Sequence, residues 1–176
     1  MHNPEMPASP VRWKPNVTVA AVIERDGRFL LVEEHTAGGL KLNTPAGHLD
    51  PGESPAEGCA REALEETAHH FTPTALVGMY MARFQKQAGG EDVTYMRFAF
   101  SGELGAFEPD RPLDTGIVRT LWLGVEAIRE RRPLHRSPLV MRCIDDHLAG
   151  RRWPLDLLVA DPSVHAGFSA APGGGE

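Results

Sequence analysis

The amino-acid sequence predicts an α/β fold in which a mixed β-sheet carries helices on its faces. Segments rich in β-branched and apolar residues alternate with segments that open on helix-start signals, in the order hairpin, helix, several strands, helix, helix. The chain has 176 residues, of which 41% are hydrophobic, and this suits one domain with a substantial core. The sequence contains neither glycine-rich phosphate-binding motif, so neither a Rossmann fold nor a P-loop is expected.

The first predicted strands form a β-hairpin. Residues 16–24 and 28–33 are rich in β-branched and apolar side chains, and Asp26-Gly27 between them is a two-residue turn signal. Residues 36–51 contain several glycines and prolines, so we expect a loop-rich stretch with a short strand at residues 46–49.

A helix is predicted from Ser54 to about Ala68. Ser54 suits the N-cap, Pro55 suits the first helical position, and Glu57 stands where the second half of a capping box is required. These signals come directly before an acidic segment, so they fix where its side chains lie on the helix.

The second half of the chain is predicted to supply further strands and two helices. The expected strands cover residues 75–84, 92–104 and 118–123, with a turn at residues 87–91 between the first two. A short helix is expected at residues 125–131, and Ser137-Pro138 starts another that Gly150 ends. The polar ends, residues 1–12 and 161–176, are expected to be flexible tails around a domain at residues 13–160.

The charge balance excludes several classes of partner. Lys plus Arg number 18 and Asp plus Glu number 24, for a formal charge of −6. Proteins that bind nucleic acid or anionic membranes in general need a basic face, so neither is an expected partner. Cys59 and Cys143 fit no metal-ligand spacing and are expected to be reduced thiols. Met1–Pro10 lacks a basic and an apolar region, so the expected location is the cytoplasm.

The chemistry is expected in an acidic patch on the helix predicted over residues 54–68. Glu62, Glu65 and Glu66 stand at positions i, i+3 and i+4, so their carboxylates converge on one face. Like charges at this spacing repel, and hard oxygen ligands without Cys or His favour Mg²⁺ or Mn²⁺. Taken alone, the same pattern also suits a solvated helix face in which Arg61 forms ion pairs.

The spacing around this patch resembles the sequence box of the Nudix hydrolases. The matching residues are Gly47, Glu53, Arg61, Glu62, Glu65 and Glu66. Two positions depart from the box, because Ala68 stands where the family has Gly and His69 where it has an aliphatic residue. Flanking segments at residues 17–20, 45–49, 136–140 and 153–155 extend the resemblance over most of the chain, which is similar to the NudJ-type phosphatase subgroup. The resemblance implies a Nudix-like α/β/α sandwich with a mixed β-sheet.

The resemblance also implies roles for individual residues in a divalent-metal-dependent hydrolase. The expected metal ligands are Glu62, Glu65, Glu66 and the backbone carbonyl of Ala46, with Glu53 supporting the loop or a second cation. Arg61 is expected to orient the carboxylates. The general base is left open between Glu65, Glu66 and Asp114, which precedes the strand predicted at residues 118–123.

Substrate-binding candidates lie on the strands and loops that should face the box. They are Lys14, Lys41, Arg83, Arg97 and His48, each of which also suits an ordinary surface or structural role. Four aromatic residues are candidates to stack a base, although aromatic residues in strands also build cores: Trp13, Tyr80, Phe84 and Tyr95.

The resemblance implies that the enzyme cleaves nucleoside tri- and diphosphates and the pyrophosphorylated pyrimidine precursor of thiamine, with release of phosphate. Two alternatives remain open: an ADP-ribose or dinucleotide pyrophosphatase, and a nucleotide-binding domain without catalysis. The expected partner is a small-molecule nucleotide or pyrophosphate, and the expected assembly is a monomer or homodimer.

Overall fold

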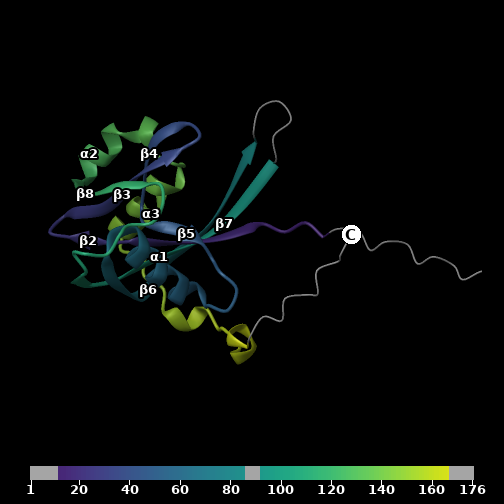
Figure 1. Ribbon diagram of the computed structural model, residues 1–176. Helices are drawn as coiled ribbons and strands as arrows, with labels where there is room; N and C mark the ends of the chain where they lie inside the picture. The colour runs from purple at the N-terminus through teal and green to yellow at the C-terminus, as the bar shows by residue number, and fades with distance from the viewer. Residues whose placement is uncertain (1–11, 86–91, 167–176) are drawn as a thin grey trace, which may run out of the picture.

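The computed structural model describes residues 12–85 and 92–166, and its strands divide into two four-stranded sheets (Figure 1). The turn predicted at residues 87–91 lies outside the described residues. The α/β class and the mixed sheet predicted from the sequence are confirmed. The strands form two sheets, whereas the sequence predicted one.

The first sheet has the strand order β5-β1-β7-β6. Its strands are β1 (Asn16–Val22), β5 (Ala46–His48), β6 (His69–Gln85) and β7 (Asp92–Phe107). β1 runs parallel to β7, while the other two pairs are antiparallel, so this sheet is mixed. The short strand expected at residues 46–49 is therefore confirmed, and both long strands extend beyond their predicted ends. In Figure 1 the far ends of β6 and β7 project away from the body of the molecule.

The second sheet is antiparallel and is built around β3. β2 (Glu24–Arg25) and β8 (Ile117–Gly124) pair with β3 (Arg28–Thr36), which also pairs with β4 (Gly39–Asn43). Strand β4 lies in the stretch predicted to be a loop. Its residues pair with β3 across a short turn that begins at Thr36, and this long-range pairing overrides the glycine-rich local signal.

The predicted hairpin is only partly correct. Asp26 and Gly27 do form a tight turn with positive φ values of 53° and 72°, but only the two residues of β2 pair with β3 across it. The preceding strand β1 pairs with β5 and β7 in the other sheet instead. Residues 19–23 are buried, which suits a central strand covered on both faces better than a hairpin arm with one solvated face.

Helices cover both faces of the first sheet. Val19 and Ala21 of β1, with Ile23 just after the strand, belong to a core cluster that contains Cys59 and Ala63 of α1 (Pro55–Thr67). The alternate residues of the strand belong to a second cluster, which contains side chains of α2 (Val125–Glu130) and α3 (Leu139–Leu148). Because successive strand side chains point to opposite faces, α1 and α3 lie on opposite sides of the sheet. This is the predicted α/β/α arrangement.

Helix α1 begins and ends as the sequence predicts. Ser54 is the N-cap, and its hydroxyl and the Glu57 carboxylate form both bonds of the capping box. Ala68 is the C-cap, with φ 56° in the left-handed region where the Nudix box has Gly. An alanine in this conformation costs about 1 kcal/mol relative to glycine, and Ala68 nevertheless ends the helix one residue after Thr67.

The C-terminal part of the chain packs beside α1. Gly150, with φ 75°, follows the end of α3, as predicted. Pro162–His165 form a short 3-10 helix, and His165 Nδ1 lies 3.1 Å from the carbonyl oxygen of Gly52. The described part of the chain thus extends into the segment expected to be a tail from residue 161. Helices long and apolar enough to cross a membrane are not found among residues 12–85 and 92–166.

Candidate active site

The acidic face of α1 lies directly against strand β5. Glu66 Oε2 accepts a hydrogen bond of 2.8 Å from the backbone N–H of Ala46. The Glu62 carboxylate lies so close to Gly47 that a Cβ there would stand 2.2 Å from Glu62 Cδ. Two glutamates of α1 that lie one turn apart, Glu62 and Glu66, therefore pack against β5. Only a glycine at position 47 leaves room for Glu62.

Arg61 connects the box residues to one another. Its Nε and Nη2 donate to the two carboxylate oxygens of Glu53 at 2.9 and 2.7 Å, and Nη2 also donates to the carbonyl oxygen of His48 at 2.9 Å. Its Nη1 donates to Glu62 Oε1 at 2.8 Å and to Glu65 Oε2 at 2.9 Å. One planar guanidinium thus holds three carboxylates and the His48 carbonyl at the end of β5 in a single geometry.

Burial and crowding change the acidity of these carboxyl groups. Burial raises the pKa of Glu66 to about 8, and the neighbouring charges of Glu62, Glu34 and Asp114 add to this rise. Burial likewise raises the pKa of Glu62, against the opposing effect of Arg61. Burial of Glu53 would also raise its pKa, but its hydrogen bonds to Arg61 and to the Asp50 N–H outweigh burial and lower it. The site thus carries more negative charge than Arg61 neutralises.

Asp114 comes to this site from the loop before β8. Its backbone N–H donates to the carbonyl oxygen of Glu65 at 2.9 Å, and its Oδ1 accepts from the Thr115 N–H at 2.7 Å. Its charge is close enough to raise the pKa of both Glu62 and Glu66. Asp114 therefore lies beside the carboxylates of α1, although it is nearly fifty residues away in sequence.

The donor chemistry of the site fits a hard divalent cation. In the part of the chain that is described, the hydrogen bonds engage one carboxylate oxygen each of Glu62, Glu65 and Glu66 and leave the other free. Within the same residues, no three acidic, His or Cys side chains are arranged around a common ion position; the Arg61 guanidinium lies between the carboxylates instead. Oxygen-only donors and excess negative charge match the preferences of Mg²⁺ and Mn²⁺.

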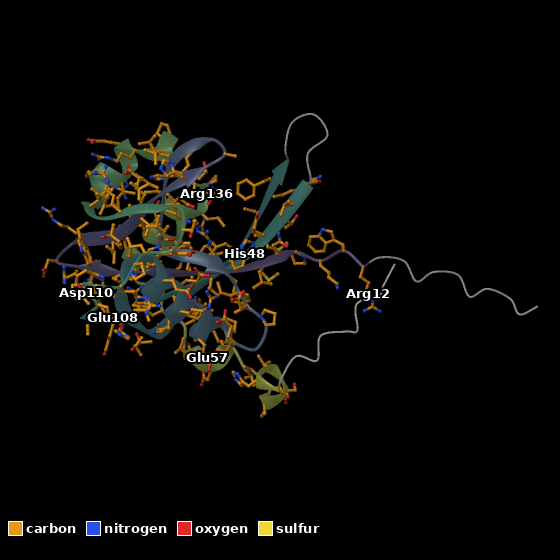
Figure 2. All side chains as sticks on the ribbon, in the orientation of Figure 1. Arg12, His48, Glu57, Glu108, Asp110 and Arg136 are labelled. Atoms are coloured by element: carbon orange, nitrogen blue, oxygen red, sulfur yellow. The ribbon has the colours of Figure 1, made fainter. Side chains whose placement is uncertain are left out.

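A cleft of about 590 Å³ opens beside this carboxylate cluster. Ala46 and Gly47 belong to its wall, so the cleft reaches the backbone on which Glu66 and Glu62 rest. His48 and Arg136, both labelled in Figure 2, also line it. The other lining residues come from both sheets and the start of α3: Asn16, Thr18, Glu34, Thr36, Lys41, Asn43, Phe84, Val93, Tyr95, Arg97, Ser137 and Leu139.

Three of the five substrate-binding candidates line the cleft, and two do not. Lys41, His48 and Arg97 are in its wall, although Lys41 Nζ also donates to the carbonyl oxygen of Pro133 at 3.1 Å. Lys14 is exposed and is not among the lining residues. Arg83 is ion-paired to Asp92, with its Nε 2.8 Å from Asp92 Oδ1.

The four aromatic candidates separate in the same way. Phe84 and Tyr95 line the cleft, whereas Trp13 is 68% exposed outside it. The hydroxyl of Tyr80 donates to Asp146 Oδ2 at 3.0 Å, next to α3, so this ring is part of the core around that helix. Tyr80, Phe84 and Tyr95 all lie on strands. The alternation of side chains along a strand does not by itself show which of these rings faces the cleft.

Sequence reasoning missed several polar residues of the cleft. Glu34 and Asn43 lie on β3 and β4, and Arg136 and Ser137 lie just before α3. Arg136 and Ser137 stand in one of the flanking segments that resemble the Nudix hydrolases, which is the only signal the sequence offers for them. Glu34 and Asn43 carry no local motif, and only the pairing of their strands brings them to the site.

Comparison with known proteins agrees with the geometry. The NUDIX domain family model matches residues 13–143. Phosphatase NudJ of Escherichia coli strain K12 is 36% identical over 146 residues, which is 83% of this chain and 92% of that protein. A solved Nudix hydrolase from Nitrosomonas europaea is 54% identical with a TM-score of 0.78, over 84% of this chain and 98% of that one. The MutT protein of Methanosarcina mazei, 24% identical with a TM-score of 0.58, shares the fold over 81% of this chain and 100% of its own. This chain therefore belongs to the Nudix hydrolases, enzymes that cleave phosphoric anhydrides.

Proposed function

We propose that this protein is a divalent-metal-dependent hydrolase of the diphosphate linkages in nucleoside tri- and diphosphates, and that it releases phosphate in the cytoplasm. One observation carries the proposal. Three carboxylates of α1 each keep a free oxygen, and two of them, Glu66 and Glu62, contact Ala46 and Gly47 in the wall of a cleft that also holds buried Arg97. Phosphatase NudJ, to which the chain is similar, supports the phosphate-releasing activity.

Glu62, Glu65 and Glu66 would hold Mg²⁺ or Mn²⁺, with the Ala46 carbonyl as a further ligand and Glu53 as a support. When bound, the cation neutralises diphosphate charge and makes a water molecule more acidic. Arg61 keeps the carboxylates oriented through its five hydrogen bonds. Glu65 and Glu66 belong to the cluster and Asp114 lies beside it, so these three carboxylates are the candidates to accept a proton from the attacking water.

Among the proposed substrate-binding residues, Arg97 has the strongest support. It is 7% exposed, it lines the cleft, and its Nε and Nη1 have no hydrogen-bond partner among the described residues. Buried guanidinium donors are almost always paired in folded proteins, so a ligand in the cleft would complete this site. Lys41 and His48 add polar groups to the wall of the cleft, and Lys14 and Arg83 have weaker support.

The test is product analysis with Mg²⁺ and Mn²⁺ over a panel of substrates. The panel contains nucleoside tri- and diphosphates, ADP-ribose, dinucleoside polyphosphates and the thiamine-pyrimidine pyrophosphate. Orthophosphate from tri- and diphosphates supports the proposal. Nucleoside monophosphates from ADP-ribose or dinucleotides alone would instead indicate a pyrophosphatase, and binding without turnover would indicate a non-catalytic domain.

Two isosteric variants connect the activity to the carboxylates. Glu65→Gln and Glu66→Gln should each lower kcat by at least about a hundredfold, the scale on which positioned acid-base groups act. Glu130→Gln is the matched control, because Glu130 is an exposed glutamate at the end of α2. Near wild-type rates in the first two variants would contradict the site assignment.

A further inference from the structure

Four side chains on the floor of the cleft bury polar atoms that have no hydrogen-bond partner in the part of the chain that the structure describes. These atoms are Thr18 Oγ1 on β1, Glu34 Oε1 on β3, Asn43 Oδ1 on β4, and Nε and Nη1 of Arg97 on β7. Thr18 and Arg97 are partners in the parallel pairing of β1 with β7. Leaving one such atom unpaired costs about 1–3 kcal/mol, so five of them on four side chains of one cleft indicate that a ligand supplies the missing bonds.

The mixture of groups excludes a simple anion as that ligand. Arg97 only donates hydrogen bonds, whereas the Glu34 carboxylate only accepts them. These two side chains are not ion-paired to each other among the described residues, and Glu34 Oε2 lies 3.9 Å from Arg136 Nη1. A phosphate placed against Arg97 would meet the negative charge of Glu34. The floor suits a neutral group that presents both donors and acceptors.

Three aromatic rings also line this cleft. Phe84 and Tyr95 meet edge to face with their ring centroids 5.7 Å apart, and the His48 ring is 6.0 Å from Tyr95. All three rings line the cleft. Rings of this kind bind flat heterocycles by stacking, which tolerates any base and leaves discrimination to the polar edge.

We propose that Glu34 and Arg97 read the hydrogen-bonding edge of a nucleobase, with Glu34 selecting bases that carry an exocyclic amino group. Glu34 Oε1 accepts a hydrogen bond from the amino group, and Arg97 donates one to a ring nitrogen or carbonyl oxygen beside it. The base stacks on the aromatic rings that line the cleft. This inference rests on the proposed function, because it assigns a binding position to the base of the nucleotide substrate proposed there. Ala46 and Gly47 line the same cleft, so the phosphates of such a nucleotide extend toward Glu62 and Glu66.

Pairs of nucleotides that differ in one amino group test this assignment. CTP against UTP, and ATP against ITP, exchange an amino group for an oxo group at the edge that Glu34 reads. The wild-type protein should favour the amino member of each pair by at least about tenfold in kcat/KM, the scale of one hydrogen bond to a buried charge. Glu34→Gln should reduce that ratio by about tenfold, mainly through KM, and should lower hydrolysis of inorganic tripolyphosphate by clearly less than it lowers hydrolysis of CTP.

Glu33→Gln is the matched control, since it removes the same charge one residue away. Glu33 does not line the cleft; its Oε2 accepts from Arg119 Nε at 2.8 Å, across the pairing of β3 with β8. The ratio of kcat/KM for CTP to kcat/KM for UTP in Glu33→Gln should equal that of the wild type. Binding of CMP and UMP in EDTA, measured by calorimetry, gives a second readout that does not depend on turnover, and there too Glu34→Gln should remove the preference for CMP.

Two results would overturn the inference while the proposed function stands. One is an unchanged nucleotide ratio in Glu34→Gln, and the other is an equal loss on tripolyphosphate, which would place Glu34 with the phosphate-binding machinery. Failure of the proposed function looks different, because the wild-type protein would then hydrolyse none of the nucleotides. That result overturns the inference as well.

Discussion

The carboxylate of Glu62 occupies the space where a side chain at position 47 would begin. A Cβ built on Gly47 would stand 2.2 Å from Glu62 Cδ and Oε1, far inside van der Waals contact. The glycine is therefore required by the glutamate, since its φ does not lie in the left-handed region where glycine is favoured for its backbone. The pairing of β5 with β1 and the packing of α1 on that sheet bring these two residues together.

Gly47→Ala should lower kcat by at least about a hundredfold, because Glu62 must leave its position to make room for the methyl group. The free energy of unfolding should fall by about 1–3 kcal/mol, as overpacked sites generally do. Steady-state kinetics and urea unfolding check both effects. Gly124→Ala is the control, because Gly124 has φ −69° and a Cβ there would meet nothing within 4 Å. Full activity in Gly47→Ala would show that the observed position of Glu62 is not needed.

Arg61→Lys should weaken the site even though it keeps the charge. A single ammonium group cannot reproduce the five hydrogen bonds that Arg61 makes with Glu53, Glu62, Glu65 and His48. We expect kcat to fall by about tenfold or more and the free energy of unfolding to fall by about 1–2 kcal/mol, since partly buried carboxylates lose their partner. Thermal unfolding and kinetics measure these effects.

Arg129→Lys provides the comparison for that variant. Arg129 is also paired with two carboxylates, Glu126 and Asp145, but all three side chains are largely exposed. Exposed ion pairs contribute little, so this change should alter stability by less than about 0.5 kcal/mol. Equal effects of the two Arg→Lys changes would contradict the special role of Arg61.

Local sequence signals predicted the parts of the fold that depend on neighbouring residues. The capping box and Pro55 located the start of α1, and Asp26-Gly27 located the turn between β2 and β3. Sheet membership depends on residues far apart in sequence, so the sequence could not show that β1 leaves the hairpin and joins β5 and β7. Strand β4 was missed for the same reason, because its glycine-rich surroundings resemble a loop.

The candidate site likewise combines features that local sequence determines with features that depend on long-range packing. The carboxylates of α1 follow from helical spacing alone, so their convergence was predictable. Arg97 and Arg83 look alike in sequence, both lying on predicted strands, yet one is buried in the cleft wall and the other is ion-paired at an exposed position. That difference is set by strand register and by the fold of the second sheet, and neither can be obtained from a single sequence.

Addition of Mg²⁺ or Mn²⁺ should raise the melting temperature of the metal-free protein. A cation at about one hundred times its Kd stabilises the folded state by about 2.7 kcal/mol, which corresponds to roughly 5–10 °C for a domain of this size. Glu62→Gln and Glu66→Gln should lose most of this shift, and the exposed Glu130→Gln should keep it. Differential scanning calorimetry with and without EDTA measures the shift. Its absence in the wild-type protein would contradict a cation site on α1.

The stability of the metal-free protein should fall as the pH rises from about 4.5 to about 8. Glu66 has a folded-state pKa of about 8, raised by burial and by Glu62, Glu34 and Asp114, against an ordinary value of 4.5. Within this window the folded protein keeps a proton that the unfolded chain has released, so a higher pH favours unfolding. Below about pH 4.5 both states are protonated, and this contribution to the free energy of unfolding is constant.

Glu66→Gln should remove most of this slope and make the metal-free protein more stable than the wild type at pH 8, by an amount on the order of a few kcal/mol. The glutamine amide oxygen can still accept the Ala46 N–H, so the change removes the charge and keeps the contact. Urea unfolding at several pH values in EDTA measures both proteins, and groups that titrate equally in the two cancel in the difference. Parallel profiles would show that Glu66 is ionised at neutral pH without a cation. A difference that disappears at low pH would instead show that the ionised Glu66 carboxylate destabilises the metal-free fold.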